Sequence, residues 1–282
     1  MPTTESPVDT FVRLTTLRRE GSTQVSEPGG ASPAGTMFGG MLCAQAVMAA
    51  SAMTDLPLPH SLHMVFLRPG NVSEPVVYRT EALREGRSFA TFRVSGEQAA
   101  GRVVDGTVSL TSSRPGPAQQ QASSPAGAPP DGLVPLWQAM GSSEPGAIVF
   151  HTPGELQTGP LPLQERGDPP NFRFWYELDK RLELNGAVRA AALVHGSDQL
   201  SAPLARYFFG RPGSQSSLDH SVWFHGEEMP AGMHILEFES PRAASGRALL
   251  LGAMFQSDGA LVMSVAQEAT FRIPEAGAGQ QP

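Results

Sequence analysis

The chain has 282 residues, enough for one large domain or for two modest ones with separate cores. Its formal net charge of −7 argues against a protein that binds the nucleic-acid backbone, because that binding depends on clustered Lys and Arg. The single cysteine, Cys43, excludes an intramolecular disulfide and a metal site built from several cysteines. Cys43 lies in an apolar run, where we expect a packed, unreactive thiol.

The N-terminal stretch lacks the charged start and the apolar core of a secretory signal. No apolar run approaches the roughly 18 residues that are needed to span a bilayer. We therefore expect a cytoplasmic protein without membrane insertion.

The first part of the chain predicts one helix followed by a meander of strands. Residues before about Val8 look like a loose tail. From Met41 to Met53, apolar residues recur every three or four positions among small side chains, which predicts a buried helix. Four strand-like runs follow, and turn residues separate them; they are 61–69, 75–85, 88–98 and 102–112. This order predicts an α+β domain in which an antiparallel sheet wraps around the helix.

Residues 113–131 are rich in Pro, Ala, Gln and Ser and nearly uncharged, which is typical of a flexible linker. The linker divides the chain into a domain at 8–112 and a domain at 132–274. The residues after Pro274 look loose for the same compositional reason.

The second part repeats the order of the first. A strand-like run at 172–178 leads to a helical region at about 186–207, in which Gly196 and Pro203 should bend or break the helix near Asp198. Four strand-like runs follow, at 220–226, 232–240, 247–257 and 260–273.

Landmarks in the two parts lie at a nearly constant offset. The pairs at an offset of 160 are His60-Ser61 with His220-Ser221, and Gly86-Arg87 with Gly246-Arg247. Gly101 and Gly259, each taken to open the last strand, are 158 apart, a two-residue slip in the preceding turn. We infer that a domain of roughly 110 to 130 residues has been duplicated.

Several stretches together resemble the acyl-CoA thioesterase II family, the double-hotdog thioesterases. The stretches are MFGGMLCAQA (37–46), HSLHMVFLRPG (60–70), SDQLSAPLARY (197–207), SLDHSVWFH (217–225) and LVMSVAQEATFR (261–272). The second and fourth of these motifs are specific when they occur together, whereas a lone FGG would not be. The resemblance covers nearly the whole chain outside the linker and the tails.

The resemblance implies an α+β double hotdog, with two tandem hotdog domains that each wrap an antiparallel sheet around a long helix. It implies hydrolysis of a medium- or long-chain acyl-CoA by an activated water, with no cofactor and no metal, since coenzyme A belongs to the substrate. The family's catalytic trio falls on Asp198, Ser217 and Gln267. Ser217 replaces a Thr that is common in the family, and the looser rotamer of Ser predicts weaker activity. At family level we also expect a homo-oligomer of double-hotdog units.

These residue types suit thioester hydrolysis, which needs a base, groups that orient water, and donors for an oxyanion. Asp198 can be the base if burial raises its pKa, while Ser217 and Gln267 can hold the water or the thioester oxygen. Backbone N–H groups at a helix N-terminus could complete the oxyanion site. At the repeat offsets the trio pairs with Phe38, Pro57 and Ser109, so only the second half carries it.

Each residue also has a simpler interpretation. Asp198 alone suits a surface charge or a cap, Ser217 alone a strand-start hydroxyl, and Gln267 alternates with its neighbours so that it faces either solvent or the site. His195, one helical turn from Asp198, is expected at the surface rather than as a modulator of the Asp198 pKa. The candidates for coenzyme A phosphates are Arg68, Arg87, Arg206 and Arg211, and His63, His151, His225 and His234 lack metal-ligand spacing.

Three other functions remain open from the residues. A hotdog protein could bind an acyl-CoA or acyl-carrier thioester without turnover, and a hotdog hydratase is disfavoured because its Asp/His motif is absent. A serine hydrolase using Ser221 would need a GxSxG elbow, which does not accompany that serine. Asp219, His220 and Ser221 are consecutive, so they alternate faces in a strand and cannot form a triad among themselves. We therefore assign His220 and Ser221 to the architecture of the strand.

Overall fold

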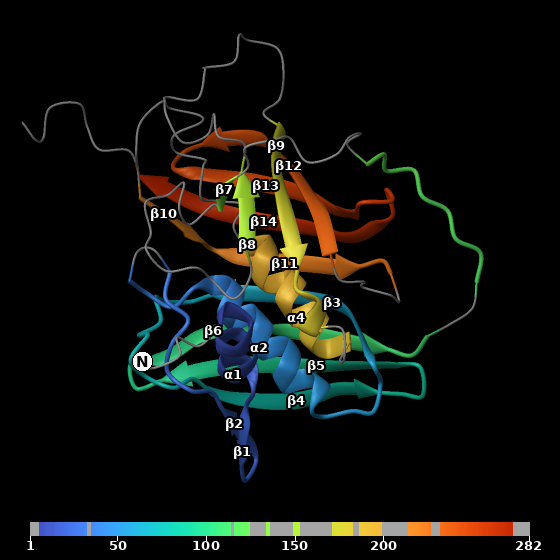
Figure 1. Ribbon diagram of the computed structural model, residues 1–282. Helices are drawn as coiled ribbons and strands as arrows, with labels where there is room; N and C mark the ends of the chain where they lie inside the picture. The colour runs from blue at the N-terminus through green and yellow to red at the C-terminus, as the bar shows by residue number, and fades with distance from the viewer. Residues whose placement is uncertain are drawn as a thin grey trace, which may run out of the picture.

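The computed structural model describes residues 6–32, 35–113, 116–124, 134–135, 149–152, 171–182, 186–198, 214–226 and 232–272. These residues form one 14-stranded sheet with helices packed against it (Figure 1). The first half of the chain, blue to green, lies below the second half, yellow to red, in this view.

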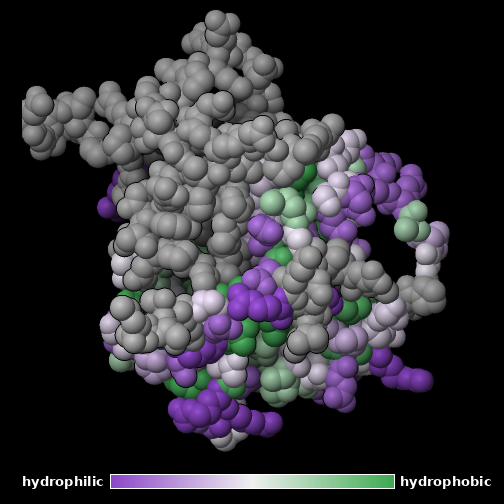
Figure 2. All heavy atoms as spheres, in the orientation of Figure 1, coloured by the Kyte–Doolittle hydropathy of each residue, from purple (hydrophilic) through white to green (hydrophobic). Residues whose placement is uncertain are grey.

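The described elements of the first half are α1 (Pro7–Thr15), β1 (Arg18–Glu20), β2 (Thr23–Val25), α2 (Gly39–Ser51), β3 (Leu58–Phe66), β4 (Val77–Glu85), β5 (Phe89–Gln98) and β6 (Gly101–Thr111). The predicted helix and the four predicted strands are confirmed to within three residues at most ends. The β1–β2 hairpin was not predicted, and it forms a hydrophilic projection at the lower end of the molecule (Figure 2).

The described elements of the second half are β7 (Val134–Pro135), β8 (Val149–Thr152), β9 (Asn171–Leu178), the 3-10 turn η2 (Lys180–Leu182), α4 (Gly186–Ser197), β10 (Ser214–Ser217), β11 (Asp219–Phe224), β12 (Gly232–Ala244), β13 (Arg247–Gln256) and β14 (Leu261–Arg272). The predicted strands are again found. The second helix was predicted to continue to 207, and positions 199–207 lie outside the described residues.

The sheet has an approximate two-fold relation at its centre. The two middle strands, β3 and β11, pair antiparallel, and Leu62 lies opposite Val222, 160 residues later. Outward from this pair the order is β6-β5-β4-β2 on one side and β14-β13-β12-β9 on the other. The duplication and the α+β double hotdog are therefore confirmed, with one continuous sheet across both halves.

The strand registers correct one of the residue correspondences that we inferred between the two repeats. Leu110 lies opposite Ala90, and Gln267 lies opposite Leu250, which is 160 residues after Ala90. Gln267 therefore corresponds to Leu110, not to Ser109. The β13–β14 hairpin is therefore three residues shorter than the β5–β6 hairpin. Gly101 is the first residue of β6, whereas Gly259 still lies in the turn before β14.

The helices do not follow the offset of 160 either. α2 begins at Gly39 and α4 begins at Gly186, and the two helices pack against each other on one face of the sheet (Figure 1). Phe38 is thus the residue before α2, whereas Asp198 directly follows α4. Pairing these two residues was wrong, because the segments between helix and strand differ in length between the halves.

α1 is a further element that was not predicted. The Ser6 side chain accepts a hydrogen bond from Asp9 N at its N-terminus, and Pro7 occupies the first turn. Phe11 and Leu14 are buried, and Gln45 Nε2 of α2 donates to Leu14 O over 2.7 Å. α1 therefore belongs to the core of the first half.

Part of the predicted linker contacts the second half. Gln120 Nε2 donates to Gly259 O over 2.9 Å, and Leu261 N donates to Gln120 Oε1 over 2.7 Å. These bonds attach residues near 120 to the turn between β13 and β14.

Candidate active site

Asp198, Ser217 and Gln267 come from three separate elements and meet inside the second half. Asp198 follows α4, Ser217 ends β10, and Gln267 lies in the middle of β14. Gln267 Nε2 donates to Asp198 Oδ1 over 2.6 Å and also to Ser217 Oγ, while Ser217 Oγ lies 3.3 Å from Asp198 Oδ1. Asp198 is 4% exposed and Gln267 is 0% exposed. The structure thus brings all three predicted residues together away from bulk solvent.

A β-bulge lets two side chains reach this cluster from one edge. Ser217 lies opposite Ala269, whereas Ser221 lies opposite Ala266. The three residues between the two serines therefore face only the two residues between the two alanines. In a regular strand Ser217 and His220 would point to opposite faces. The extra residue of the bulge removes that alternation, and both side chains face Asp198.

Asp219 stabilises the backbone of the bulge. Its Oδ1 accepts from Glu268 N over 2.8 Å, and Leu218 N donates to Glu268 O over the same distance. A backbone N–H that would otherwise lack a strand partner is thereby satisfied, directly beside Gln267.

The first half contributes the N-terminus of α2. The Gly40 backbone N–H hydrogen-bonds to the Asp198 carboxylate. At Gly39, a Cβ atom would lie 2.7 Å from Asp198 Oδ2 and 2.8 Å from Phe66 Cζ, so only a glycine fits without displacement. A helix N-terminus carries partial positive charge, which favours an anion there. The site therefore combines both halves of the chain.

Burial dominates the electrostatics of Asp198. Desolvation raises its pKa to about 7, against the opposing hydrogen bonds from Gln267, Gly40 and Ser217. Burial also lowers the pKa of His195 and of His220 to about 4. Both imidazoles are therefore neutral near pH 7, and neither offsets the charge of the carboxylate.

The expectation of a surface His195 was wrong. The side chain is 7% exposed and lies edge-on between the rings of Phe11 and Phe38, with centroids 5.4 and 4.9 Å away. Phe11 belongs to α1, which covers this side of α4. Because α1 was not predicted, nothing in the predicted fold covered His195.

Sequence reasoning also missed the position of His220. This residue is fully buried, its Nδ1 lies 3.9 Å from Asp198 Oδ1, and its Nε2 lies 2.8 Å from Ser197 Oγ. Its counterpart His60 is half-buried and packs edge-on against Phe89. The period-two burial of Val222 and Phe224 would have placed His220 on the inner face.

The remaining candidates contribute less to this site. Arg68 donates to Ala100 O, and Arg206 and Arg211 lie outside the described residues. In the described ranges no three His, Cys, Asp or Glu side chains converge as metal ligands. No helix in the described part of the chain is long and apolar enough to cross a membrane.

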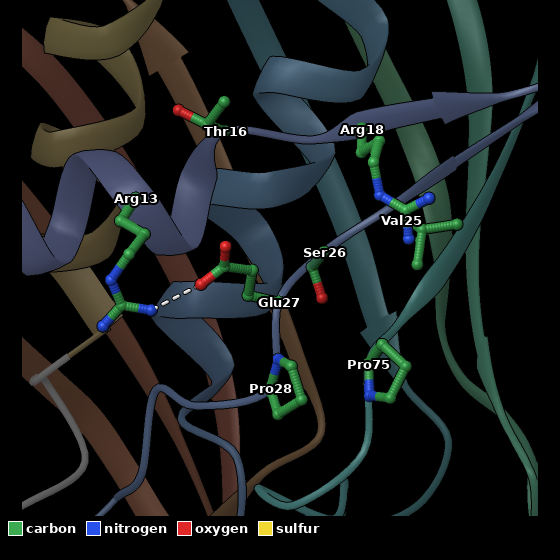
Figure 3. Close-up of a pocket in the computed structure, with 8 residues that line it drawn as sticks. All are labelled: Arg13, Thr16, Arg18, Val25, Ser26, Glu27, Pro28 and Pro75. Carbon is green, nitrogen blue, oxygen red and sulfur yellow. Dashed lines mark hydrogen bonds and ion pairs between the residues drawn. The ribbon is translucent and has the colours of Figure 1, made fainter.

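A pocket of about 720 Å³ lies beside α1 and β2 (Figure 3). It is lined by Arg13, Thr16, Arg18, Val25, Ser26, Glu27, Pro28 and Pro75. Arg13 Nη1 donates to Glu27 Oε2 over 2.6 Å across it. None of the predicted trio lines this pocket.

Comparison with known proteins supplies independent information. Family models described as the acyl-CoA thioesterase N-terminal and C-terminal domains match residues 27–111 and 120–271. Acyl-CoA thioesterase 2 of Haemophilus influenzae is 29% identical over 85% of this chain and 88% of its own length. Human acyl-coenzyme A thioesterase 8 is 29% identical over 86% of this chain and 82% of its own length.

Solved structures give the same result for the fold. The tesB protein of Mycobacterium avium subspecies paratuberculosis superposes with a TM-score of 0.78 at 28% identity, covering 95% of this chain and 100% of that one. Acyl-CoA thioesterase II TesB2 of Mycobacterium marinum superposes with a TM-score of 0.75 at 27% identity, covering 97% and 100%.

Proposed function

This chain belongs to the acyl-CoA thioesterase family, and on that premise we propose that Asp198, Ser217 and Gln267 hydrolyse acyl-CoA thioesters through one activated water. The observation that carries the proposal is the Asp198 carboxylate, which is buried, has a pKa raised to about 7, and is hydrogen-bonded by the other two side chains. A base with a pKa near the working pH combines a large ionised fraction with useful basicity.

In the proposed reaction the ionised Asp198 takes a proton from a water as the water oxygen attacks the thioester carbonyl carbon. The carbonyl π electrons move to the oxygen, and the Gly39 N–H at the start of α2, which Asp198 does not use, stabilises that charge. The tetrahedral intermediate then re-forms its C=O bond as the C–S bond breaks. The CoA thiolate takes the proton from Asp198, and the new carboxylic acid ionises on release.

Two apolar side chains support an acyl substrate. Phe38 and Phe66 are only partly buried, and they lie against the glycines at the start of α2 that contact Asp198. We propose that they form the wall beside the first carbons of a medium or long acyl chain. Each methylene that is buried adds roughly 0.8 kcal/mol of binding, or about fourfold in affinity.

A thiol-release assay with acyl-CoAs of graded length tests the proposal. We expect wild-type turnover with kcat/KM rising through medium chain lengths, and we expect Gln267→Ala and Ser217→Ala each to lower kcat by about 10²-fold. Ser216→Ala is the matched control, because Ser216 is the exposed neighbour of Ser217 in β10. Saturable acyl-CoA binding without thiol release would instead favour a non-hydrolytic binding protein.

The pH dependence of kcat/KM should report the pKa of the catalytic base. Only ionised Asp198 accepts a proton, so kcat/KM should fall about tenfold per pH unit below about pH 7, where the pKa of Asp198 lies. The Gln267 hydrogen bond lowers that pKa, so Gln267→Ala should move the acid limb of its residual activity to higher pH. A kcat/KM that is flat between pH 5 and 8 would exclude Asp198 as the base.

A further inference from the structure

We propose that the pocket beside α1 and β2 binds the nucleotide end of coenzyme A, with Arg18 as its main phosphate contact. The inference rests on the proposed function, because the thioester end of the same molecule is placed at Asp198. Arg18 was not among the phosphate candidates that the sequence indicated.

The charge of the pocket suits a phosphorylated ligand. Its lining includes two arginines, Arg13 and Arg18, against one glutamate, Glu27, in a chain whose formal net charge is −7. Arg13 pairs with Glu27, and Arg18 pairs with Glu20, which does not line the pocket. The side chain of Arg18 is 73% exposed, so its guanidinium group is accessible to an incoming anion. A guanidinium binds phosphate oxygens through two parallel N–H groups.

The size and the remaining lining of the pocket suit a nucleoside. Its volume of about 720 Å³ lies within the roughly 300–1,000 Å³ of small-molecule sites. Ser26 is buried, and its Oγ accepts from Val76 N over 3.0 Å. No acceptor for the Ser26 hydroxyl proton lies among the described residues, so that proton can bond a ribose or phosphate oxygen. Apolar walls for a planar base come from Val25, Pro28 and Pro75 (Figure 3).

The pocket lies at the end of the first-half sheet that is next to Asp198. Val25 ends β2 and lies opposite Val77, which begins β4. Across β5 and β6 the same end of the sheet leads to Phe66, the last residue of β3. Phe66 in turn lies against Gly39, beside the Asp198 carboxylate. The pocket and the proposed reaction centre therefore share one end of the sheet.

A short loop joins the pocket to the start of α2. Gly30 follows Pro28 by two residues, and Gly30 O accepts from Phe38 N over 2.8 Å. Two residues of extended chain and one such bond place Phe38 within about 12 Å of Pro28. The pantetheine chain of coenzyme A has about 13 bonds between sulfur and phosphorus, so it spans about 15 Å, as about four extended residues do. Residues 27–31 all reach the surface, so a thioester at Asp198 can place its phosphates in the pocket along this loop.

Acyl-CoA and acyl-pantetheine separate the two ends of the substrate, because both carry the same thioester but only acyl-CoA carries the nucleotide. We expect Arg18→Gln to raise KM for acyl-CoA by about tenfold with little change in kcat, since charged hydrogen bonds to phosphate are lost. Adding Arg13→Gln should raise that KM by about tenfold more. The KM for acyl-pantetheine should stay within about twofold of the wild-type value in both variants.

Arg19→Gln is the matched control. Arg19 is the neighbour of Arg18 in β1 and its replacement removes the same charge, but it bonds to Gly21 O over 3.4 Å and does not line the pocket. Its KM for acyl-CoA should stay at the wild-type value. An equal rise of KM in Arg18→Gln and Arg19→Gln would mean that only the overall charge matters. An equal rise with acyl-CoA and acyl-pantetheine would mean that Arg18 does not contact the nucleotide.

Adenosine 3′,5′-bisphosphate, the nucleotide end without pantetheine, gives a readout that does not depend on turnover. Calorimetry should show saturable binding that is about tenfold weaker in Arg18→Gln and unchanged in Arg19→Gln, and the compound should compete with acyl-CoA. Binding without competition would overturn the proposal, because the pocket would then serve a separate nucleotide. If the wild-type protein binds the bisphosphate through Arg18 but releases no thiol, the proposed function fails and the nucleotide site stands. If it turns over acyl-CoA and Arg18→Gln leaves KM unchanged, only the nucleotide site fails.

Discussion

Asp198→Asn is expected to lower kcat by about 10³-fold or more and, at pH 8, to make the protein more stable by about 1–3 kcal/mol. The loss of activity follows because an amide cannot accept the proton of the attacking water. The gain in stability follows because the folded protein no longer buries an ionised carboxylate. Gains in stability on removing a catalytic group are common where function requires a strained or desolvated side chain.

The sign of the stability effect depends on the two pKa values of Asp198. In the folded protein the pKa is about 7, whereas an unfolded aspartate has a pKa of about 3.9. Between these values the folded state holds a proton that the unfolded state has lost, so the free energy of unfolding falls as the pH rises. Above about pH 7 the full cost is present in the wild type and absent in Asp198→Asn.

Urea unfolding at pH 5 and pH 8 measures this difference. The advantage of Asp198→Asn should be largest at pH 8 and should fall to roughly a third of that value at pH 5, where the folded carboxyl is mostly neutral but the unfolded one is already ionised. His195 and His220 titrate in both proteins, so their contributions cancel. Asp105→Asn is a control of opposite sign, because a hydrogen bond from Arg93 lowers the pKa of Asp105. An equal advantage at both pH values would mean that Asp198 is already ionised at pH 5 in the folded protein, so that its pKa is not raised by burial.

The fold could be predicted because its signals are local or repeated. Strands such as β3 and β11 carry their burial in the alternation of neighbouring residues. The duplicated His-Ser pairs showed that β3 and β11 are equivalent strands of the two halves. The pairing of Leu62 with Val222 across the two strands agrees with that equivalence. α1 also has a sequence signal, because Ser6, Pro7 and Asp9 form a helix start, but the residues before about Val8 were interpreted as a loose tail.

The site itself was only partly predictable. The family resemblance indicated three positions in the second half, but the N-terminus of α2 reaches Asp198 from the first half across the packed helices. The bulge at Leu218 depends on the mismatch of two strands that are about 50 residues apart in sequence, so no local pattern encodes it. His220 was therefore read as a regular strand residue, although the bulge aims it and Ser217 at the same carboxylate.

Gly39→Ala is expected to lower kcat by about 10²-fold without unfolding the protein, because small displacements of a catalytic group can cost that much. The new Cβ would lie 2.7 Å from Asp198 Oδ2 and 2.8 Å from Phe66 Cζ, so the carboxylate, the ring or the start of α2 must move. The backbone at Gly39 is helical and has no positive φ, so alanine causes no backbone strain. Alanine also favours a helix by about 1 kcal/mol over glycine, which offsets part of the steric cost.

Gly186→Ala provides the matched control, because Gly186 opens α4 as Gly39 opens α2. There the added Cβ would meet Pro57 O at 3.4 Å and Leu58 Cδ2 at 3.9 Å, which are ordinary contacts. We expect wild-type kcat and unchanged or slightly higher thermal stability for Gly186→Ala. Thiol release and thermal unfolding of both variants, measured side by side, separate the contact with Asp198 from a general effect of alanine at a helix start. Wild-type kcat in Gly39→Ala would mean that catalysis does not depend on the close contact between Gly39 and the Asp198 carboxylate.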